Sequence, residues 1–220
     1  MRGGGSITAA RPGINALGRA KAISHNTWIH RIARTFVRPL AATPVTPSQL
    51  TTLRLATGVA AAAAFAVGAS PWQHVGGGLF LVSMVLDRAD GELARLTGAT
   101  SARGHAYDLI ADAVSNALVL AGIGVGLRES VLGLWSIPMG LLAGVSVAVI
   151  LGLVMAVEER EGQGAAELKG FAGFDVDDAT LAIPIAVWLG WSVPLIAAAA
   201  VVAPAVAAYF IWRFRAQGGG

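Results

Sequence analysis

Four stretches of the chain carry no charged side chain, and their apolar residues predict helices that cross a membrane. They cover residues 55–86, 113–127, 130–157 and 179–212. A membrane-spanning helix needs about 20 residues at 1.5 Å each, so the first and last stretches are too long for one helix. Each of these two contains a proline close to a tryptophan, Pro71 and Pro194, which indicates a turn at the membrane surface. The pattern therefore predicts six transmembrane helices, at residues 49–69, 72–96, 103–127, 131–156, 177–191 and 194–214.

Residues 26–41 predict a helix of another kind, with one apolar and one basic face. Trp28 and Ile32 lie on its apolar face, and Arg31 and Arg38 lie opposite. Such a helix suits the anionic cytoplasmic surface of a membrane, and a helix packed against a cytosolic part of the protein is the alternative.

Composition supports the membrane assignment. Of the 220 residues, 55% are hydrophobic and 13% are charged, which is too apolar for an ordinary soluble domain. The expected fold is all-α, a polytopic membrane protein with six transmembrane helices and an N-terminal amphipathic interfacial helix. The expected segments are a flexible cytoplasmic tail at 1–25, a juxtamembrane helix at 26–41, a six-helix transmembrane domain at 42–215 and a flexible tail at 216–220.

The basic residues predict how the chain is oriented in the membrane. In the six-helix topology, Arg128 is the clear basic residue of one side, and the opposite side carries Arg31, Arg34, Arg38, Arg54, Arg88, Arg95, Arg103, Arg160, Lys169, Arg213 and Arg215. The side rich in arginine is expected to be cytoplasmic, with both termini. The formal charge of +3 reflects these membrane flanks, and the absence of interleaved basic and aromatic residues argues against nucleic acid as a partner.

Four aspartates interrupt the apolar pattern where the second and third predicted helices meet. Asp87 and Asp90 stand one turn apart in the second helix, and Asp108 and Asp112 stand one turn apart in the third. Two helices that face each other through these positions would gather four carboxylates in one cavity. Mutual repulsion forbids full ionisation of such a group unless cations are bound, so we expect a metal site.

The chemistry of these side chains indicates which metal. Carboxylate oxygens are hard ligands, and the chain contains no cysteine, so Mg²⁺ or Mn²⁺ fits best and Ca²⁺ is possible. Four carboxylates can hold two such ions, which suits phosphoryl transfer. Ser115 and Asn116 extend the polar side of the third helix beyond Asp112, either as partners of that carboxylate or, as we favour, in hydrogen bonds between helices.

Residues of small volume lie next to the aspartates. Gly91, Ala94 and Gly104 share the faces of the acidic residues, so a bulky anionic substrate could approach them closely. Arg95 and Arg103 lie at the polar ends of the same two helices, where a guanidinium can pair with phosphate or with an aspartate.

With these residues in place, the chain resembles the CDP-alcohol phosphotransferase family, also called CDP-alcohol phosphatidyltransferases. The resemblance rests on the pattern D-x2-D-G-x2-A-R-x8-G-x3-D-x3-D, which is matched without a gap by Asp87, Asp90, Gly91, Ala94, Arg95, Gly104, Asp108 and Asp112. A softer similarity covers TPVTPSQLTTLRL at 43–55, which looks like the stretch that opens the first membrane helix in that family.

The resemblance implies an enzyme that moves a substituted phosphate group, commonly a phosphatidyl group, from a CDP-linked donor such as CDP-diacylglycerol to a hydroxyl of an alcohol or alcohol phosphate, with release of CMP. It implies that two divalent cations are held by Asp87, Asp90, Asp108 and Asp112, and that Asp112 is also the general base. It implies nucleotide contacts by Asp87, Gly91, Ala94, Arg95 and Gly104. Arg103, Arg160 and Lys169 are candidates for contact with the acceptor.

The resemblance also suggests a homodimer in a lipid membrane, which we expect to be a bacterial inner membrane with the active site facing the cytoplasm. One alternative keeps the family and exchanges the roles, with a soluble CDP-alcohol as donor and a lipid hydroxyl as acceptor. An alternative from another class is a cation or proton transporter, because carboxylates inside a membrane also mark ion pathways. A transporter gives no reason for Gly91, Ala94 and Gly104 at their fixed offsets.

Overall fold

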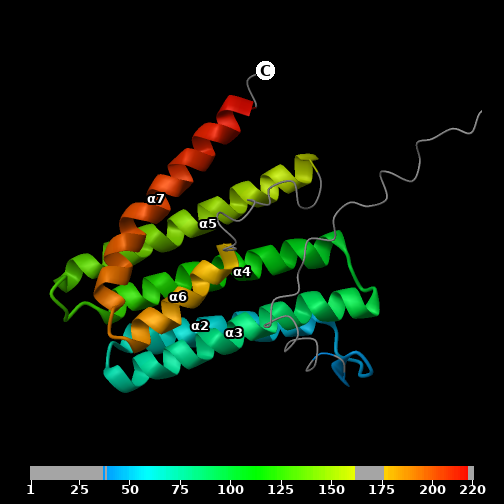
Figure 1. The fold of residues 1–220 in the computed structure, drawn as a ribbon, viewed down its shortest axis with the longest axis horizontal. Coiled ribbons are helices and arrows are strands. Elements are labelled where there is room, and N and C mark those ends of the chain that lie inside the picture. The colour runs from blue at the N-terminus through cyan, green and yellow to red at the C-terminus, as the bar shows by residue number, and fades with distance from the viewer. Residues whose placement is uncertain (1–36, 38, 162–175, 218–220) are drawn as a thin grey trace, which may run out of the picture.

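The computed structural model describes residues 37, 39–161 and 176–217, and in these ranges it contains helices and no strand. The elements are α2 (Pro47–Val67), α3 (Ser70–Thr97), α4 (Ala102–Gly126), a short 3-10 helix η1 (Gly133–Trp135), α5 (Ser136–Glu161), α6 (Val176–Trp188) and α7 (Ser192–Gln217). Figure 1 labels the α-helices from α2 to α7. The six α-helices confirm the predicted all-α fold.

Local sequence explains where the helices near the acidic residues begin and end. Thr46 caps α2 in a reciprocal pair of hydrogen bonds, in which the backbone N–H of Gln49 donates to Thr46 Oγ1 and the backbone N–H of Thr46 donates to Gln49 Oε1. Ser101 caps α4 by accepting from the backbone N–H of Gly104 over 3.0 Å. Gly98 ends α3 with φ +67°, a conformation that favours glycine.

The predicted boundaries are close to those of the structure at α2, α3 and α4, which each begin within two residues of the expected position. The largest shift at a helix start is at α5, which was expected from residue 131 and begins at Ser136. Turns and η1 occupy the residues before it, and Gly133, at the start of η1, has φ +54°, which lies outside the α-helical region. At the C-terminus, α7 continues to Gln217, so residues 216 and 217 of the expected tail are helical.

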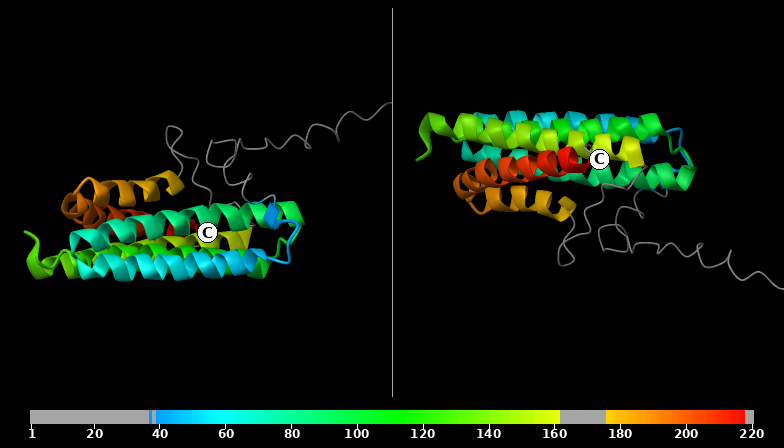
Figure 2. Two further views of the ribbon diagram at one scale, coloured as in Figure 1. Left: turned by 90° about the horizontal axis from the view of Figure 1, so that it is seen from below. Right: turned by 90° about the horizontal axis from the view of Figure 1, so that it is seen from above.

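The helices pack as an elongated bundle in which α2 is central to the N-terminal half. α2 packs along both α3 and α4, α4 packs on α5, and α5 packs on α7. α6 lies against α3, on the side away from α2 (Figure 2). α7 diverges from the other helices toward its C-terminal end (Figure 1).

Close approach of backbones holds α2 and α4 together. A Cβ atom at Gly122 of α4 would collide with the carbonyl oxygen of Ala62 on α2, so this crossing requires glycine. Small residues allow such contacts in membranes, where no water drives helices together. Phe65, Phe80 and Val119 fill the neighbouring core and are almost completely buried.

The chain is an all-α polytopic membrane protein. Four described helices are long and apolar enough to span a bilayer, namely Pro47–Val67, Ala102–Gly126, Gly133–Val157 and Ser192–Arg215. The expected six spans also include α3, which has 28 residues but carries the polar acidic segment, and α6, whose 13 residues cover about 20 Å. Large apolar side chains such as Val145 and Val201 are exposed on α5 and α7, as expected for contact with lipid tails.

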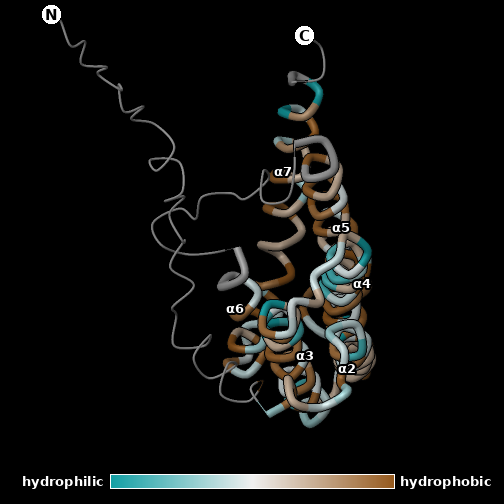
Figure 3. The backbone as a smooth tube through the Cα atoms, turned by 90° about the vertical axis from the view of Figure 1, so that its right-hand side faces the viewer, coloured by the Kyte–Doolittle hydropathy of each residue, from teal (hydrophilic) through white to brown (hydrophobic). Residues whose placement is uncertain are grey.

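The two ends of the bundle differ in character. Trp72, Trp135 and Trp191 are exposed at the end that also carries Arg128, and exposed tryptophans are typical of a membrane surface. Polar segments lie at the opposite end of α3 and α4, among mostly apolar helices (Figure 3). The four aspartates belong to this second end.

The amphipathic helix predicted at 26–41 lies mostly outside the described residues, as do the tail at 1–25 and residues 218–220. Its last part is described at Val37, which is completely buried in a small apolar cluster with Leu50, Ala89 and Leu93. The end of this segment therefore packs against α2 and α3, close to the acidic end of the bundle.

Candidate functional site

Three of the four aspartates of α3 and α4 form a close group. Asp87, Asp90 and Asp108 each offer one carboxylate oxygen, and these three oxygens lie within 4.8 Å of one another. Asp90 is 3% exposed, and Asp87 and Asp108 are partly exposed. Asp112 is outside this group of three, although it follows Asp108 by one turn on α4.

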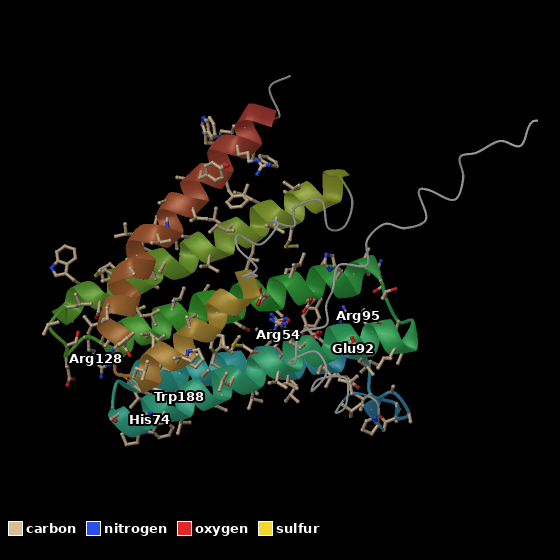
Figure 4. The ribbon with its side chains drawn as sticks, in the orientation of Figure 1. Arg54, His74, Glu92, Arg95, Arg128 and Trp188 are labelled. Atoms are coloured by element: carbon tan, nitrogen blue, oxygen red, sulfur yellow. The ribbon has the colours of Figure 1, made fainter. Side chains whose placement is uncertain are left out.

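Asp112 faces a different partner, Arg54 on α2. Nη2 of Arg54 lies 2.5 Å from Oδ1 of Asp112, while Nη1 lies 2.5 Å from Oδ1 of Asp108 and 2.7 Å from Oδ1 of Asp87. Arg54 is 3% exposed and lies between α3 and α4 in the middle of the bundle (Figure 4). The acidic site is therefore formed by three helices, α2, α3 and α4.

Hydrogen bonds from neighbouring side chains fix the carboxylates further. The hydroxyl of Thr51 on α2 donates to Oδ2 of Asp90 over 2.8 Å, and Nδ2 of Asn116 donates to Oδ1 of Asp112 over 2.8 Å. Asn116 is thus a partner of Asp112 within α4, and the favoured prediction of a bond between helices is wrong for this residue. Thr51 and Arg54 share one face of α2 because they are three positions apart.

A cavity of about 630 Å³ opens beside the aspartates. Asp90, Gly91, Ala94 and Arg95 line it from α3, and Gly104, His105 and Asp108 line it from α4. The cavity is also lined by the start of α2, at Thr46, Pro47, Ser48 and Thr51, and by residues 99–102 between α3 and α4. Gly91, Ala94 and Gly104, the small residues singled out in the sequence, therefore line this cavity.

Arg95 lines this cavity but its guanidinium pairs with Glu92 on the same helix. Nε and Nη2 of Arg95 donate to Oε2 of Glu92 over 3.2 and 3.0 Å. Glu92 is 5% exposed, whereas the side chain of Arg95 is 54% exposed. The sequence indicated phosphate or an aspartate as the partner of Arg95, and in the structure its partner is Glu92.

The three acceptor candidates are not brought to the cavity in the described residues. Arg103 is exposed at the start of α4, and its neighbours Ala102 and Gly104 line the cavity while it does not. The side chain of Arg160 and the whole of Lys169 lie outside the described residues.

Arg54 and Thr51 are the main site residues that sequence reasoning missed. Arg54 had been counted only among the basic flanks that set orientation. A signal was available, because Arg54 is followed by 32 residues without a charge, and an arginine inside an apolar helix needs a buried acidic partner.

The residues at the site fit a divalent cation. Three carboxylate oxygens within 4.8 Å of one another form a hard donor set of the kind that Mg²⁺ and Mn²⁺ prefer. Four carboxylates and one guanidinium have a formal charge of minus three, so the cluster retains a strong attraction for cations even with Arg54 in place. The adjoining cavity leaves room for a phosphate group beside Asp90 and Asp108.

Comparison with known proteins identifies the family of the chain. The sequence profile of the family described as CDP-alcohol phosphatidyltransferase matches residues 44–212, which include all four aspartates and Arg54. A protein of Rubrobacter xylanophilus named "Bifunctional IPC transferase and DIPP synthase" is 34% identical over 84 residues, which are 38% of this chain. The match spans only 19% of that relative. Because the family profile covers most of the chain, the protein belongs to the CDP-alcohol phosphatidyltransferase family, whose members transfer a phosphate-linked group from a CDP-alcohol to an alcohol.

Proposed function

We propose that the protein transfers a phosphatidyl group from CDP-diacylglycerol to the hydroxyl of an alcohol or alcohol phosphate and releases CMP. The observation that carries this proposal is the cavity of about 630 Å³ that joins the aspartate cluster to the starts of two helices. The membrane setting supports a lipid-linked donor, because a diacylglycerol tail can remain in the bilayer while its diphosphate enters the cavity from the polar end.

The starts of α2 and α4 favour the diphosphate of such a donor. Ser48 in the first turn of α2, and Ala102 and Gly104 in the first turn of α4, line the cavity. A helix N-terminus carries partial positive charge and backbone N–H groups that attract phosphate. Gly91 and Ala94 add no bulk to the opposite wall, so a nucleotide can approach α3 closely.

Asp87, Asp90 and Asp108 would hold the divalent ions, and the family resemblance adds Asp112 as a fourth ligand. When bound, two such ions neutralise the diphosphate and the charge that develops on departing CMP. The chain's own residues orient the ligands: Thr51 donates to Asp90, and Arg54 contacts Asp87 and Asp108.

Asp112 is proposed as the general base. Its Oδ1 accepts from Arg54 and Asn116, and its side chain is 37% exposed, so the carboxylate is fixed yet reachable. The acceptor hydroxyl gives its proton to Asp112 while its oxygen bonds to the phosphorus that bears the diacylglycerol. The bond from that phosphorus to the oxygen of CMP then breaks. Arg103, Arg160 and Lys169 remain candidates for holding the acceptor.

The orientation in the membrane is also part of the proposal. Arg88, Arg95 and Arg103 lie toward the end of the bundle that carries the aspartates, and Arg128 lies toward the other. By the positive-inside rule the cavity then faces the cytoplasm, where CDP-linked donors and soluble alcohols are available. The homodimer and the bacterial inner membrane stay predictions.

A direct assay tests the reaction. The purified protein is reconstituted with CDP-diacylglycerol, Mg²⁺ or Mn²⁺ and a panel of alcohols and alcohol phosphates, and both CMP and lipid products are measured by mass spectrometry. We expect CMP release that requires the metal and one acceptor, and that is lost in Asp90→Asn. A parallel series with soluble CDP-alcohols and lipid acceptors decides the donor. Turnover in that series alone would overturn the lipid-linked donor, and turnover in excess chelator would overturn the metal role.

A further inference from the structure

Arg54 touches three of the four aspartates from a helix that carries no acidic residue of its own. Its Nη1 lies 2.7 Å from Asp87 and 2.5 Å from Asp108, and its Nη2 lies 2.5 Å from Asp112. The side chain is 3% exposed, so this charge is compensated by the cluster and not by solvent. A buried charge in a membrane helix is costly unless it is paired in this way.

The two nitrogens of Arg54 have different tasks. Nη1 lies between Asp87 on α3 and Asp108 on α4, two members of the group whose oxygens lie within 4.8 Å. Nη2 contacts Asp112, which lies outside that group and also accepts from Asn116. A guanidinium is planar and its nitrogens are fixed relative to one another, so it can hold Asp108 and Asp112 in two set directions at once.

The backbone of Arg54 is anchored as well. Its carbonyl oxygen accepts from the hydroxyl of Ser83 on α3 over 3.0 Å, and this serine is 2% exposed. One turn earlier on α2, Thr51 donates to Asp90. Arg54 therefore reaches the carboxylates from a stretch of α2 whose position relative to α3 is fixed by two buried hydrogen bonds.

We propose that Arg54 is a positioning residue of the transfer reaction, with a charge that sets how strongly the aspartate cluster attracts divalent cations and a forked side chain that fixes Asp112 for its role as base. The inference rests on the proposed function, because it takes the aspartates as the ligands of the cations and Asp112 as the base. The effect of the charge and the effect of the forked guanidinium can be separated, because lysine retains the positive charge and lacks the guanidinium.

The first measurement is thermal unfolding of the detergent-purified protein, followed by tryptophan fluorescence, over a titration with Mn²⁺. We expect Mn²⁺ to raise the unfolding midpoint of the wild type. In Arg54→Met the midpoint without metal falls, and the apparent affinity for Mn²⁺ rises by about tenfold, because one positive charge has left the cluster. In Arg54→Lys the affinity for Mn²⁺ stays within about threefold of wild type.

The second measurement is the turnover number at saturating Mn²⁺. Both Arg54→Met and Arg54→Lys are expected to lose about 100-fold, since neither can hold Asp108 and Asp112 together, and a misplaced reacting group costs rate on this scale. In Arg54→Met the affinity for Mn²⁺ rises while the turnover number falls. Loss of packing alone does not produce these opposite changes.

Arg128→Met is the matched control. Arg128 also joins α2 and α4, because its Nη1 donates to the carbonyl oxygens of Ala66 and Val125 over 2.9 and 3.1 Å, but it does so at the far end of the bundle. This variant should lower the midpoint equally with and without Mn²⁺ and leave turnover at the wild-type value.

Each outcome has a defined meaning. If Mn²⁺ does not stabilise the wild type, the metal site of the proposed function is wrong. If Mn²⁺ stabilises the wild type and Arg54→Met shows the same affinity and turnover, the role of Arg54 is wrong and the metal site stands. If Arg54→Met does not fold, Arg54→Lys decides. Wild-type turnover in Arg54→Lys would contradict the role of the forked guanidinium in positioning Asp112. A large change in its Mn²⁺ affinity would contradict the role of the positive charge in metal binding.

Discussion

Thr51 on α2 donates its hydroxyl hydrogen to Oδ2 of Asp90 on α3 over 2.8 Å, and both side chains are only 3% exposed. The bond joins two helices at the level of the aspartate cluster. It also sets the direction of the most buried of the four carboxylates. We therefore expect this hydroxyl to affect metal binding through Asp90.

Replacement of Thr51 by valine tests this relationship. Valine has the same shape and no hydroxyl, so Asp90 loses a buried donor at a cost of about 1 to 3 kcal/mol. We expect weaker Mn²⁺ binding and lower turnover, with both restored in Thr51→Ser. The control is Thr57→Val, because the hydroxyl of Thr57 donates to the carbonyl oxygens of Leu53 and Arg54 on its own helix. Equal effects of the two valine variants on metal binding would contradict the role of Thr51.

Asp112→Asn should abolish transfer with little loss of folded protein. Asparagine retains an oxygen that can accept from Arg54 and Asn116, so the contacts of α4 survive while the base is removed. The expected loss of turnover is about 100-fold to 10,000-fold, the usual contribution of a general base. CMP release gives the rate, and the unfolding midpoint verifies the fold. Full activity in this variant would remove the base assignment.

Gly91→Leu should block binding of the CDP-linked donor by bulk. The nearest atom to a Cβ at Gly91 is Nη2 of Arg95 at 3.9 Å, so the new side chain fits without strain and projects into the cavity. The control is Gly78→Leu on the same helix, where nothing lies within 4 Å of a Cβ. Donor affinity, measured by competition with CDP, should fall at least about tenfold in the first variant only. Unchanged affinity would show that the nucleotide does not pass along this face of α3.

Gly122→Val should destabilise the bundle far from the aspartates. A Cβ here collides with the carbonyl oxygen of Ala62, so α2 and α4 must separate. We expect a lower unfolding midpoint, by an amount equivalent to about 1 to 3 kcal/mol, and unchanged affinity for Mn²⁺ in the folded fraction. Gly152→Val on α5 is the control, since nothing lies within 4 Å of its Cβ. A variant with the wild-type midpoint would mean that the close crossing is dispensable.

Much of this site could be predicted from local patterns. Asp87 and Asp90, and likewise Asp108 and Asp112, are separated by one helical turn, and Gly91 and Gly104 lie at fixed offsets from them. Helical periodicity alone places each pair on one face. The apolar runs place the six helices, and the caps at Thr46 and Ser101 account for the starts of α2 and α4.

What could not be predicted depends on which helix faces which. The position of α2 along both α3 and α4 is a matter of packing between segments far apart in sequence, and no periodicity within α2 encodes it. The pairing of Arg54 with acids 33, 54 and 58 residues away follows from that packing. The separation of Asp112 from the group of three has the same origin, because Nη2 of Arg54 holds its carboxylate.

The order of α2, α3 and α4 along the chain has a consequence for biosynthesis. A nascent chain emerges from its N-terminus, so α2 with Arg54 reaches the membrane before α3 and α4, which carry its acidic partners. We expect each of these aspartates to pair with Arg54 as its helix inserts, because the pairing lowers the cost of a lone arginine in the bilayer. Once residue 126 has been added, every side chain of the acidic cluster is present, before the last three helices exist.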